Sequence, residues 1–198
     1  MIRSSTLPEW QVSQWFNQKT PLQLSDLRGR VVMVHAFQML CPGCVSHGLP
    51  QAERIYRHFS SEQLAVIGLH TVFEHHRAMT PIALEAFLHE YRITHPVGVD
   101  QPVQGQAIPA TMQAWKMHGT PSVFLFDQTG RLRLHEFGRL DDLTLGTTIG
   151  RLMAGPGRTS GVDAPTEQDP HSTGTDCDDH GCRAGSGVRL PAGDAVGR

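Results

Sequence analysis

The chain has 198 residues, a length that suits one domain of ordinary size and an additional segment. Its formal net charge is −2, and it has no dense stripe of lysine or arginine, which argues against nucleic acid or anionic membrane as a partner. No stretch reaches the roughly 20 apolar residues of a membrane span, and the N-terminus lacks the apolar run of a secretory signal. We therefore expect a cytoplasmic protein.

The first strongly apolar run occupies residues 31–37 and follows a turn-like segment at 22–30. A nearly continuous apolar run is typical of a strand buried on both faces, so this strand should be central in its sheet. Residues 45–59 then carry apolar side chains at helical spacing, with Pro50 among them. A proline at that place should kink the helix.

A second short buried strand is predicted at residues 63–70, and a helix that begins with Pro81 at 81–92. The order strand, helix, strand, helix implies parallel pairing. A shorter helix is predicted at 109–117. Strands at 122–127 and 131–137 flank a three-residue loop with glycine at the bend, so they should pair as an antiparallel hairpin. A last helix, capped by Asp141 or Asp142, should reach Leu152.

The composition changes near residue 154, where Gly, Pro, Ser, Thr and Asp replace the large apolar residues. Such a segment buries too little surface to offset the entropy of ordering it. We therefore divide the chain into an N-terminal extension at 1–20, a folded domain at 21–153 and a flexible, mostly disordered tail at 154–198.

Two cysteines lie where the first buried strand passes into a helix, in the sequence Cys41-Pro42-Gly43-Cys44. The unpaired N–H groups of a first helical turn favour a thiolate at Cys41, whose sulfur can face solvent there. Cys44, one turn along, can resolve a mixed disulfide formed at Cys41. The alternative is half of a zinc site, but the predicted domain has no second ligand pair at metal-site spacing, so we favour thiol chemistry.

This order of elements, with Cys-x-x-Cys after the first strand and Gly119-Thr120-Pro121 before the hairpin, resembles the thioredoxin superfamily over roughly residues 20–153. The segment from Thr71 to Val103 is similar to the strand–helix insertion of the TlpA-like and DipZ-like branch, and so are residues 67–71, 91–100 and 119–130. The resemblance implies an α/β thioredoxin fold: a central mixed sheet flanked by helices, with a strand–helix insertion and a disordered C-terminal tail.

Two positions depart from the pattern of that branch. Leu40 precedes the first cysteine, where tryptophan is usual, and Pro50 lies one position later from Cys44 than the usual proline. Both changes should reshape the rim of the site.

The resemblance also implies a function, that of a thiol–disulfide oxidoreductase with Cys41 as nucleophile and Cys44 as resolving thiol. No bound cofactor is implied. The implied partners are protein or low-molecular-weight disulfides and thiols, together with a reducing partner. Pro121 resembles the family's cis-proline, and the backbone of Thr120 would pair with an extended substrate segment.

Other residues have two interpretations each. His35 lies six positions before Cys41, where thioredoxins carry an acid, and is either a proton relay for Cys44 or a neutral core histidine. Glu74 either lies near the dithiol, as an acidic residue does in TlpA-like reductases, or is solvated, and we favour the second. We assign no metal to the histidines of the insertion, His70, His75 and His76.

The tail holds a second pair of cysteines, Cys177 and Cys182, with His180 between them. The pair can bind a soft metal, exchange with Cys41 and Cys44 as a tethered secondary redox pair, or have no function. We favour the redox pair.

Two other functions compete with dithiol exchange. One is a peroxiredoxin-like thiol peroxidase, in which Cys41 attacks hydroperoxide, although residues 37–40 lack the residues that surround a peroxidatic cysteine. The other is a non-enzymatic, metal-binding protein of thioredoxin fold.

Overall fold

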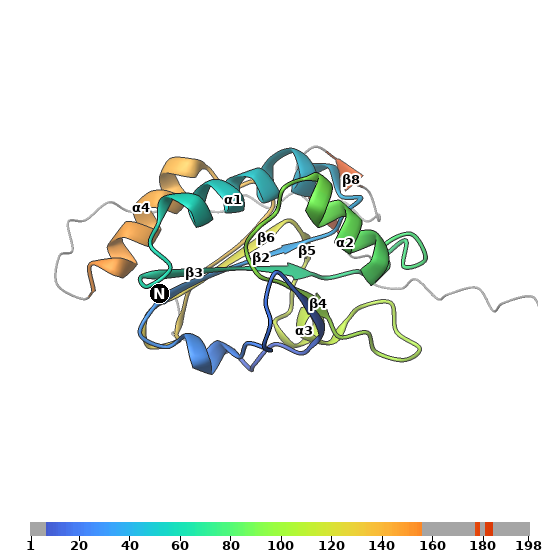
Figure 1. The fold of residues 1–198 in the computed structure, drawn as a ribbon, viewed down its shortest axis with the longest axis horizontal. Coiled ribbons are helices and arrows are strands. Elements are labelled where there is room, and N and C mark those ends of the chain that lie inside the picture. Colours follow the sequence, from blue (N-terminus) through green and yellow to red (C-terminus); the bar gives the residue numbers. More distant parts are fainter. Residues whose placement is uncertain (1–6, 156–176, 179–180, 184–198) are drawn as a thin grey trace, which may run out of the picture.

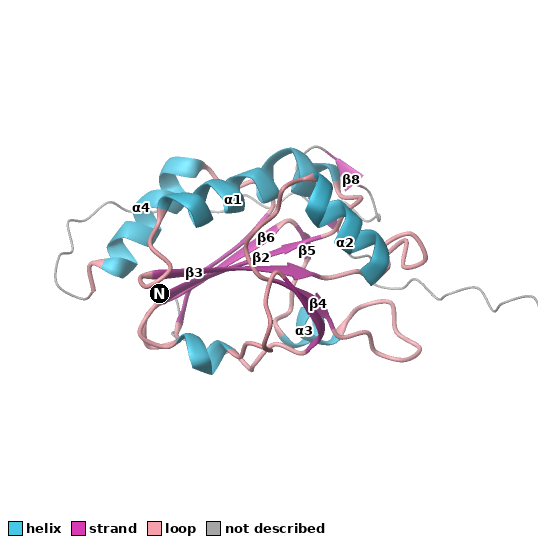
Figure 2. Cartoon of the chain, viewed as in Figure 1, coloured by secondary structure: helices cyan, strands magenta, loops and turns pink. Residues whose placement is uncertain are grey.

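A computed structural model describes residues 7–155, 177–178 and 181–183. They form a six-stranded mixed sheet, in the order β1-β4-β3-β2-β6-β7, with helices on both faces (Figure 1). Figure 2 shows the same arrangement coloured by secondary structure. Among the described helices, none combines the length and apolar character needed to span a lipid bilayer.

The strands of this sheet are β1 (Val12–Phe16), β2 (Val31–Phe37), β3 (Leu64–His70), β4 (Val97–Asp100), β6 (Ser122–Phe126) and β7 (Leu132–Phe137). The helical segments are η1 (Leu24–Leu27), η2 (Cys44–Gly48), α1 (Leu49–His58), α2 (Pro81–Glu90), α3 (Ala110–Ala114) and α4 (Asp142–Met153).

The centre of the sheet agrees with the sequence analysis. Strands β2 and β3 are parallel and every residue in both is buried, while β6 and β7 form the antiparallel hairpin. Strand β4 lies in the strand–helix insertion that the resemblance implied, whereas β1 was not expected. Strand β4 is parallel to β3, and β1 pairs antiparallel with β4 at the edge of the sheet. The segment assigned to an N-terminal extension therefore contributes a strand.

The apolar core has two parts, one on each face of the sheet. On one face, side chains of β2 and β3 pack against α1 and α4; these are Val31, Met33, Leu64, Val66, Ala52, Leu145 and Ile149. On the other, the sheet packs against η1, α3 and the N-terminal segment; the residues include Val32, Val34, Leu27, Met112, Trp115 and Trp10. Cover on both faces explains why the central strands are continuous apolar runs.

A buried carboxylate, Asp100, holds together the carboxyl ends of the parallel strands. It accepts the backbone N–H groups of Thr111 and Met112 at 2.8 and 3.0 Å, at the start of α3. It also accepts the hydroxyl of Thr71, directly after β3, at 2.9 Å. Burial raises the pKa of Asp100, and these hydrogen bonds oppose the rise. The Asp100 contacts thus fix the edge of the sheet from which the Cys41 loop departs.

The helix after the first cysteine begins with a π turn, η2, and becomes α-helical at Leu49. The backbone N–H of Leu49 bonds to the carbonyl of Cys44, five residues back, which is the π pattern. A π turn holds one residue more than an α turn, so η2 accommodates the extra residue between Cys44 and Pro50. Pro50 therefore stands at the junction of η2 and α1, where the hydrogen-bond pattern changes from π to α.

A second, small sheet contains β5 (Gly119–Thr120), β9 (Gly181–Arg183) and β8 (Cys177–Asp178), in that order. Both of its pairings are antiparallel. Within the segment that we expected to be disordered, the structure thus describes two short strands. The remainder of the predicted tail at 156–198 lies outside the described residues.

Candidate active site

The two thiols of the Cys-x-x-Cys motif lie at the start of the helical segment that follows β2. The backbone N–H of Cys44 donates to the Cys41 sulfur at 3.2 Å, as an N-cap acceptor would receive it, and the helix dipole also favours negative charge there. Both cysteines are in the thiol form, and both are fully buried, at 0% relative exposure. The expectation that the Cys41 sulfur faces solvent is therefore wrong for this state of the molecule.

The second thiol of the motif, Cys44, is held in its protonated form. Burial raises the pKa of the Cys44 thiol well above its usual range, and the neighbouring Cys41 sulfur raises it further. The backbone of Gln38 and the side chain of Thr120 act in the opposite direction. Because deprotonation of Cys44 is costly, a base or a change in its surroundings must assist it when it reacts.

The strand edge before Pro121 lies against Cys41. The Thr120–Pro121 peptide bond is cis, as the resemblance implied. The Cys41 thiol donates to the carbonyl oxygen of Thr120 at 3.5 Å. On the other side of the proline, a Cβ added to Gly48 would lie 3.2 Å from the Cβ of Pro121, so the absence of a side chain in η2 lets the helix approach the proline closely.

The loop between β2 and the dithiol is tied to the insertion by Gln38, which is fully buried. The carbonyl of Gln38 accepts the backbone N–H of Cys41 at 3.3 Å, and its side-chain oxygen accepts that of Phe73 at 3.2 Å. Its amide nitrogen donates to Glu74 at 3.3 Å. Glu74 is half-buried, and its hydrogen bond to Gln38 links it to the dithiol loop. The structure therefore agrees in part with each interpretation of Glu74, since the side chain is partly solvated and yet connected to that loop.

Behind the loop, a buried hydrogen-bonded network joins β2 to α1. His35 Nε2 lies 2.8 Å from His95 Nε2, and His95 Nδ1 lies 2.7 Å from a carboxylate oxygen of Glu53. The carboxylate of Glu53 also accepts the backbone N–H of Thr94 at 2.7 Å and pairs with Arg57 at 3.2 Å. We call His35, His95 and Glu53 the histidine–glutamate network; through Arg57 it extends from the core to the surface.

The hydrogen bonds of the network set its protonation. Burial alone would raise the pKa of Glu53, but the bonds from His95 and Thr94 outweigh it and lower the pKa to about 2. Burial, and then the proximity of His95, lower the pKa of His35 well below its usual value. His95 thus lies between the carboxylate of Glu53 and the ring of His35, with one ring nitrogen toward each.

Gly68 provides the room for this network in the sheet. It pairs with His35 in the β2–β3 register. A Cβ at this position would lie 3.2 Å from Nε2 of both His35 and His95, and 3.0 Å from a methyl carbon of Val97. A larger residue would therefore separate the two rings or displace β4.

The other histidines of the insertion do not form a second polar site. His70 is buried, and neither ring nitrogen has a hydrogen-bond partner among the described residues. Burial lowers its pKa to about 3, so the ring is neutral at physiological pH. In the part of the chain that the structure describes, no group of three or more His, Cys, Asp or Glu side chains is arranged to hold a metal ion.

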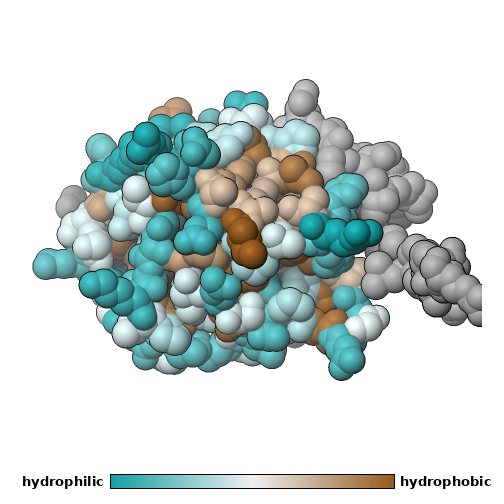
Figure 3. All heavy atoms as spheres, turned by 45° about the vertical axis from the view of Figure 1, so that its right-hand side comes forward, coloured by the Kyte–Doolittle hydropathy of each residue, from teal (hydrophilic) through white to brown (hydrophobic). Residues whose placement is uncertain are grey.

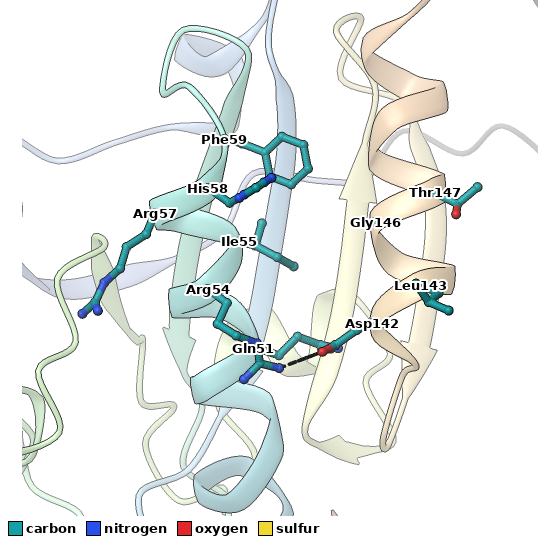
Figure 4. A pocket seen from close by; sticks show the side chains of 10 residues that line it. All are labelled: Gln51, Arg54, Ile55, Arg57, His58, Phe59, Asp142, Leu143, Gly146 and Thr147. Atoms are coloured by element: carbon teal, nitrogen blue, oxygen red, sulfur yellow. Dashed lines mark hydrogen bonds and ion pairs between the residues drawn. The ribbon is translucent and has the colours of Figure 1, made fainter.

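A surface groove of about 800 Å³ lies between α1 and α4, away from the cysteines. Figure 4 shows Gln51 and Arg54 of α1 reaching toward Asp142 of α4 across it. Asp142 lies 2.6 Å from the amide nitrogen of Gln51 and 2.9 Å from the guanidinium of Arg54. Neither cysteine lines this groove, so we do not place the redox site there.

The rim of the dithiol is apolar at Leu40, which is 55% exposed directly before Cys41. In Figure 3 the molecule is rotated so that the end with α2 and β8 comes toward the viewer, and apolar side chains are gathered within a largely polar surface. An exposed leucine beside the nucleophile can contact an apolar segment of a substrate.

Comparison with known proteins identifies the family, because the AhpC/TSA family matches residues 4–135. The chain belongs to the AhpC/TSA family. A thioredoxin-like superfamily protein of known crystal structure is 55% identical to this chain; the match covers 81% of this chain and 99% of that protein, with a TM-score of 0.73. A thiol-disulfide isomerase from Corynebacterium glutamicum, also of known crystal structure, is 51% identical; the match covers 75% of this chain and 96% of that protein, with a TM-score of 0.72.

Among curated proteins, the protein DipZ of Mycobacterium tuberculosis is 27% identical over 144 residues. The match covers 72% of this chain but only 20% of DipZ, so the chain spans about a fifth of the length of that relative. Together these similarities confirm the thioredoxin fold and the TlpA-like and DipZ-like branch. They also place this AhpC/TSA protein among thioredoxin-like thiol–disulfide oxidoreductases.

The structure brings together four of the residues selected from the sequence, namely Cys41, Cys44, Thr120 and Pro121. The described hydrogen bond of His35 goes to His95, so its role toward Cys44 stays a prediction. Sequence reasoning missed His95 and Glu53. For Glu53 a signal exists, because it lies four residues after Leu49 and three before Tyr56, on the apolar face of α1.

Proposed function

We propose that this protein exchanges disulfides through Cys41 and Cys44. The observation that carries the proposal is the asymmetry of the two thiols. Cys41 receives a backbone N–H at the start of a helix, whereas burial keeps Cys44 protonated. That difference suits a nucleophile followed by a resolving thiol.

In the proposed cycle, the Cys41 thiolate attacks a substrate disulfide and releases one substrate sulfur as a thiolate. The mixed disulfide lies against the Thr120 backbone, whose carbonyl contacts the Cys41 sulfur at 3.5 Å. Cys44 then loses its proton and attacks the Cys41 sulfur, which releases the second substrate thiolate and leaves a Cys41–Cys44 disulfide. A separate dithiol partner reduces that disulfide.

We further propose that His35 accepts the proton of Cys44 in the resolving step. In this proposal Nδ1, the ring nitrogen that is not bonded to His95, exchanges the proton with the thiol, and the chain of bonds to Glu53 provides a route for the charge. Because the pKa of His35 is low, His35 passes the proton on and does not retain it. This role rests on the ability of an imidazole to take up and release a proton, and on the position of His35 in β2, two residues before the strand ends.

Membership of the family implies protein or low-molecular-weight thiol and disulfide substrates. We propose in addition that no bound cofactor takes part, and that the protein acts in the cytoplasm.

The first test measures reduction of insulin disulfides by the full chain and its Cys41→Ser and Cys44→Ser variants. Cys41→Ser should abolish turnover, and Cys44→Ser should stop after one attack and accumulate a mixed disulfide on Cys41. Consumption of hydrogen peroxide is measured in the same preparations. Catalysed peroxide consumption without insulin reduction would replace the proposal by the peroxidase function.

The role of His35 is tested in single-turnover kinetics, which separate the first attack from the release of the mixed disulfide. His35→Ala should slow release by about 10²-fold or more, the usual contribution of a positioned acid or base, and change the first attack little. His58→Ala, which removes an exposed histidine of α1, is the matched control. Equal pH–rate profiles for release in His35→Ala and the unmodified protein would count against the role.

A further inference from the structure

A strand from near the C-terminus of the chain occupies the edge at which we expect substrates to pair. Strand β9 pairs antiparallel with β5, and the register sets Gly119 opposite Arg183 and Thr120 opposite Cys182. Thr120 is the residue whose carbonyl contacts the Cys41 sulfur. The backbone pairing therefore brings Cys182 to the register position closest to the nucleophile. In Figure 1, β8 lies next to the end of the helix where the dithiol is located.

The same register relates the two cysteines of the second pair. Strand β8 pairs antiparallel with β9, and Cys177 stands directly opposite Cys182. Residues that face each other in an antiparallel pair have Cα atoms about 4.5–5.5 Å apart. A disulfide spans Cα separations of about 4.4–6.8 Å, so this backbone can carry a bond between these two residues.

We propose that Cys177 and Cys182 form an internal disulfide substrate, delivered to Cys41 by addition of β9 to the Thr120 edge. This inference rests on the proposed function, because it gives the dithiol a partner within the same chain. It goes beyond a tethered pair of thiols, since it specifies the docking edge, the register and which of the two cysteines reacts with Cys41. Main-chain pairing of this kind fixes an extended segment independently of most of its side chains.

The exchange balances in atoms and electrons. The Cys41 thiolate attacks the sulfur of Cys182 in the Cys177–Cys182 disulfide, and Cys177 leaves as a thiolate that takes up a proton. Cys44 gives up its proton and attacks the sulfur of Cys41, which releases Cys182 as a thiolate that is protonated in turn. The result is a Cys41–Cys44 disulfide and a reduced second pair. Two electrons have moved within the chain. The Cys177–Cys182 disulfide itself is formed by the reverse exchange, with a Cys41–Cys44 disulfide that an external disulfide substrate has generated.

Occupation of the edge also affects external substrates. A second extended segment cannot pair with β5 while β9 is there, so external disulfides compete with the internal strand. Cys41 is fully buried in this arrangement, which accords with a site that is already occupied. The tail therefore acts both as a store of oxidising equivalents and as a competitor for access.

The test uses two full-length variants that differ only in the remaining tail cysteine. The Cys44→Ser/Cys177→Ser protein keeps Cys41 and Cys182, and the Cys44→Ser/Cys182→Ser protein keeps Cys41 and Cys177. Each is equilibrated in glutathione redox buffers, and the intramolecular disulfide is quantified by non-reducing peptide mass mapping. The effective concentration of Cys182 at Cys41 should exceed that of Cys177 by at least about tenfold and be independent of protein concentration.

Equal effective concentrations in the two variants would overturn the proposal, because a flexible tether has no register. Hydrogen exchange gives a second measurement on the unmodified chain, in which the backbone amides of 119–120 and 181–183 should be protected together. Rapid exchange of both segments would also overturn it.

Failure of the inference is distinguishable from failure of the proposed function. The Cys177→Ser/Cys182→Ser protein keeps Cys41 and Cys44 and is assayed for insulin reduction. Turnover there, without a preference for Cys182, would remove only the internal substrate. An absence of turnover in that protein and in the unmodified chain would remove the proposed function itself.

Discussion

Two regions beside the dithiol are built in opposite ways. The histidine–glutamate network is closed, because each side chain is bonded to another within the domain and only Arg57 reaches the surface. The Thr120 edge is completed instead by a strand that lies some sixty residues further along the chain. The closed region can govern protonation, and the open edge can govern which segment approaches Cys41. Each prediction below changes one of the two regions.

The largest effect is expected from Glu53→Ala, because it leaves His95 and the Thr94 amide without their buried acceptor. A buried donor that loses its acceptor costs about 1–3 kcal/mol of unfolding free energy, and here two donors lose theirs. The loss is measured by urea unfolding. Glu85→Ala on the exposed face of α2 is the control and should change stability by less than about 0.5 kcal/mol. A loss below about 1 kcal/mol in Glu53→Ala would contradict the network.

Stability should also fall on acidification, because the folded state keeps His35 and His70 neutral. Their pKa values are lowered in the folded protein, to about 3 for His70, so the unfolded chain binds more protons below its histidine pKa of about 6.5. Above that pH these two histidines should contribute no pH dependence to the unfolding free energy. Below it, the free energy should decrease by up to about 1.4 kcal/mol per pH unit for each histidine.

His70→Leu should remove one of these two contributions, since it replaces an imidazole that has no partner among the described residues. Urea unfolding between pH 7.5 and 5 measures the slope, and His58→Leu, at an exposed position, should leave it unchanged. Glu53 adds a further loss only below about pH 4.5, as its lowered pKa requires. Parallel pH dependences for His70→Leu and the unmodified protein would exclude this account of His70.

A smaller effect is expected from Gly68→Ala, which tests the fit of the two imidazole rings over the sheet. The added methyl group would meet both rings and Val97 at 3.0–3.2 Å. Overpacking of this kind costs about 1–3 kcal/mol. Gly146→Ala in α4 is the control, since nothing lies within 4 Å of its added carbon, and it should be neutral or stabilising by up to about 1 kcal/mol. If both variants keep full stability, the rings do not require the glycine.

The smallest effect concerns the open region. Leu40→Ser should leave unfolding free energy within about 0.5 kcal/mol, because Leu40 is 55% exposed. It should lower kcat/KM for an apolar peptide disulfide by about fivefold, equivalent to partial loss of the burial of one leucine. Leu143→Ser, at a leucine of α4 that is 80% exposed, should change neither quantity. An equal loss of kcat/KM in both variants would show that Leu40 does not contact the substrate.

The sequence was sufficient for the elements that bury apolar runs. Residues 31–37 and 63–70 were correctly predicted as parallel central strands, because burial on both faces makes such strands uniformly apolar. Strand β4 has only four residues, one of them glycine, and β1 at the edge carries Ser13 and Gln14, so neither has a pattern that separates it from a loop.

The site was predictable only where its chemistry is local. Cys41 and Cys44 are three positions apart in a motif, and Pro121 has a family signature. His95 meets His35 across sixty residues of sequence, and only the register of β2, β3 and β4 determines that contact. The pairing of β9 with β5 is equally long-range, because a match of only two residue pairs between short backbone segments leaves no pattern in composition.

The π turn of η2 limits how this domain can be recombined with its relatives. If a chimaera received a segment with one residue fewer between Cys44 and Pro50, every later position of α1 would rotate by about 100° and shift by about 1.5 Å relative to the dithiol. Glu53 would then no longer face His95. Residues 44–50 should therefore be exchanged as one block together with the partners of Glu53, or left in place.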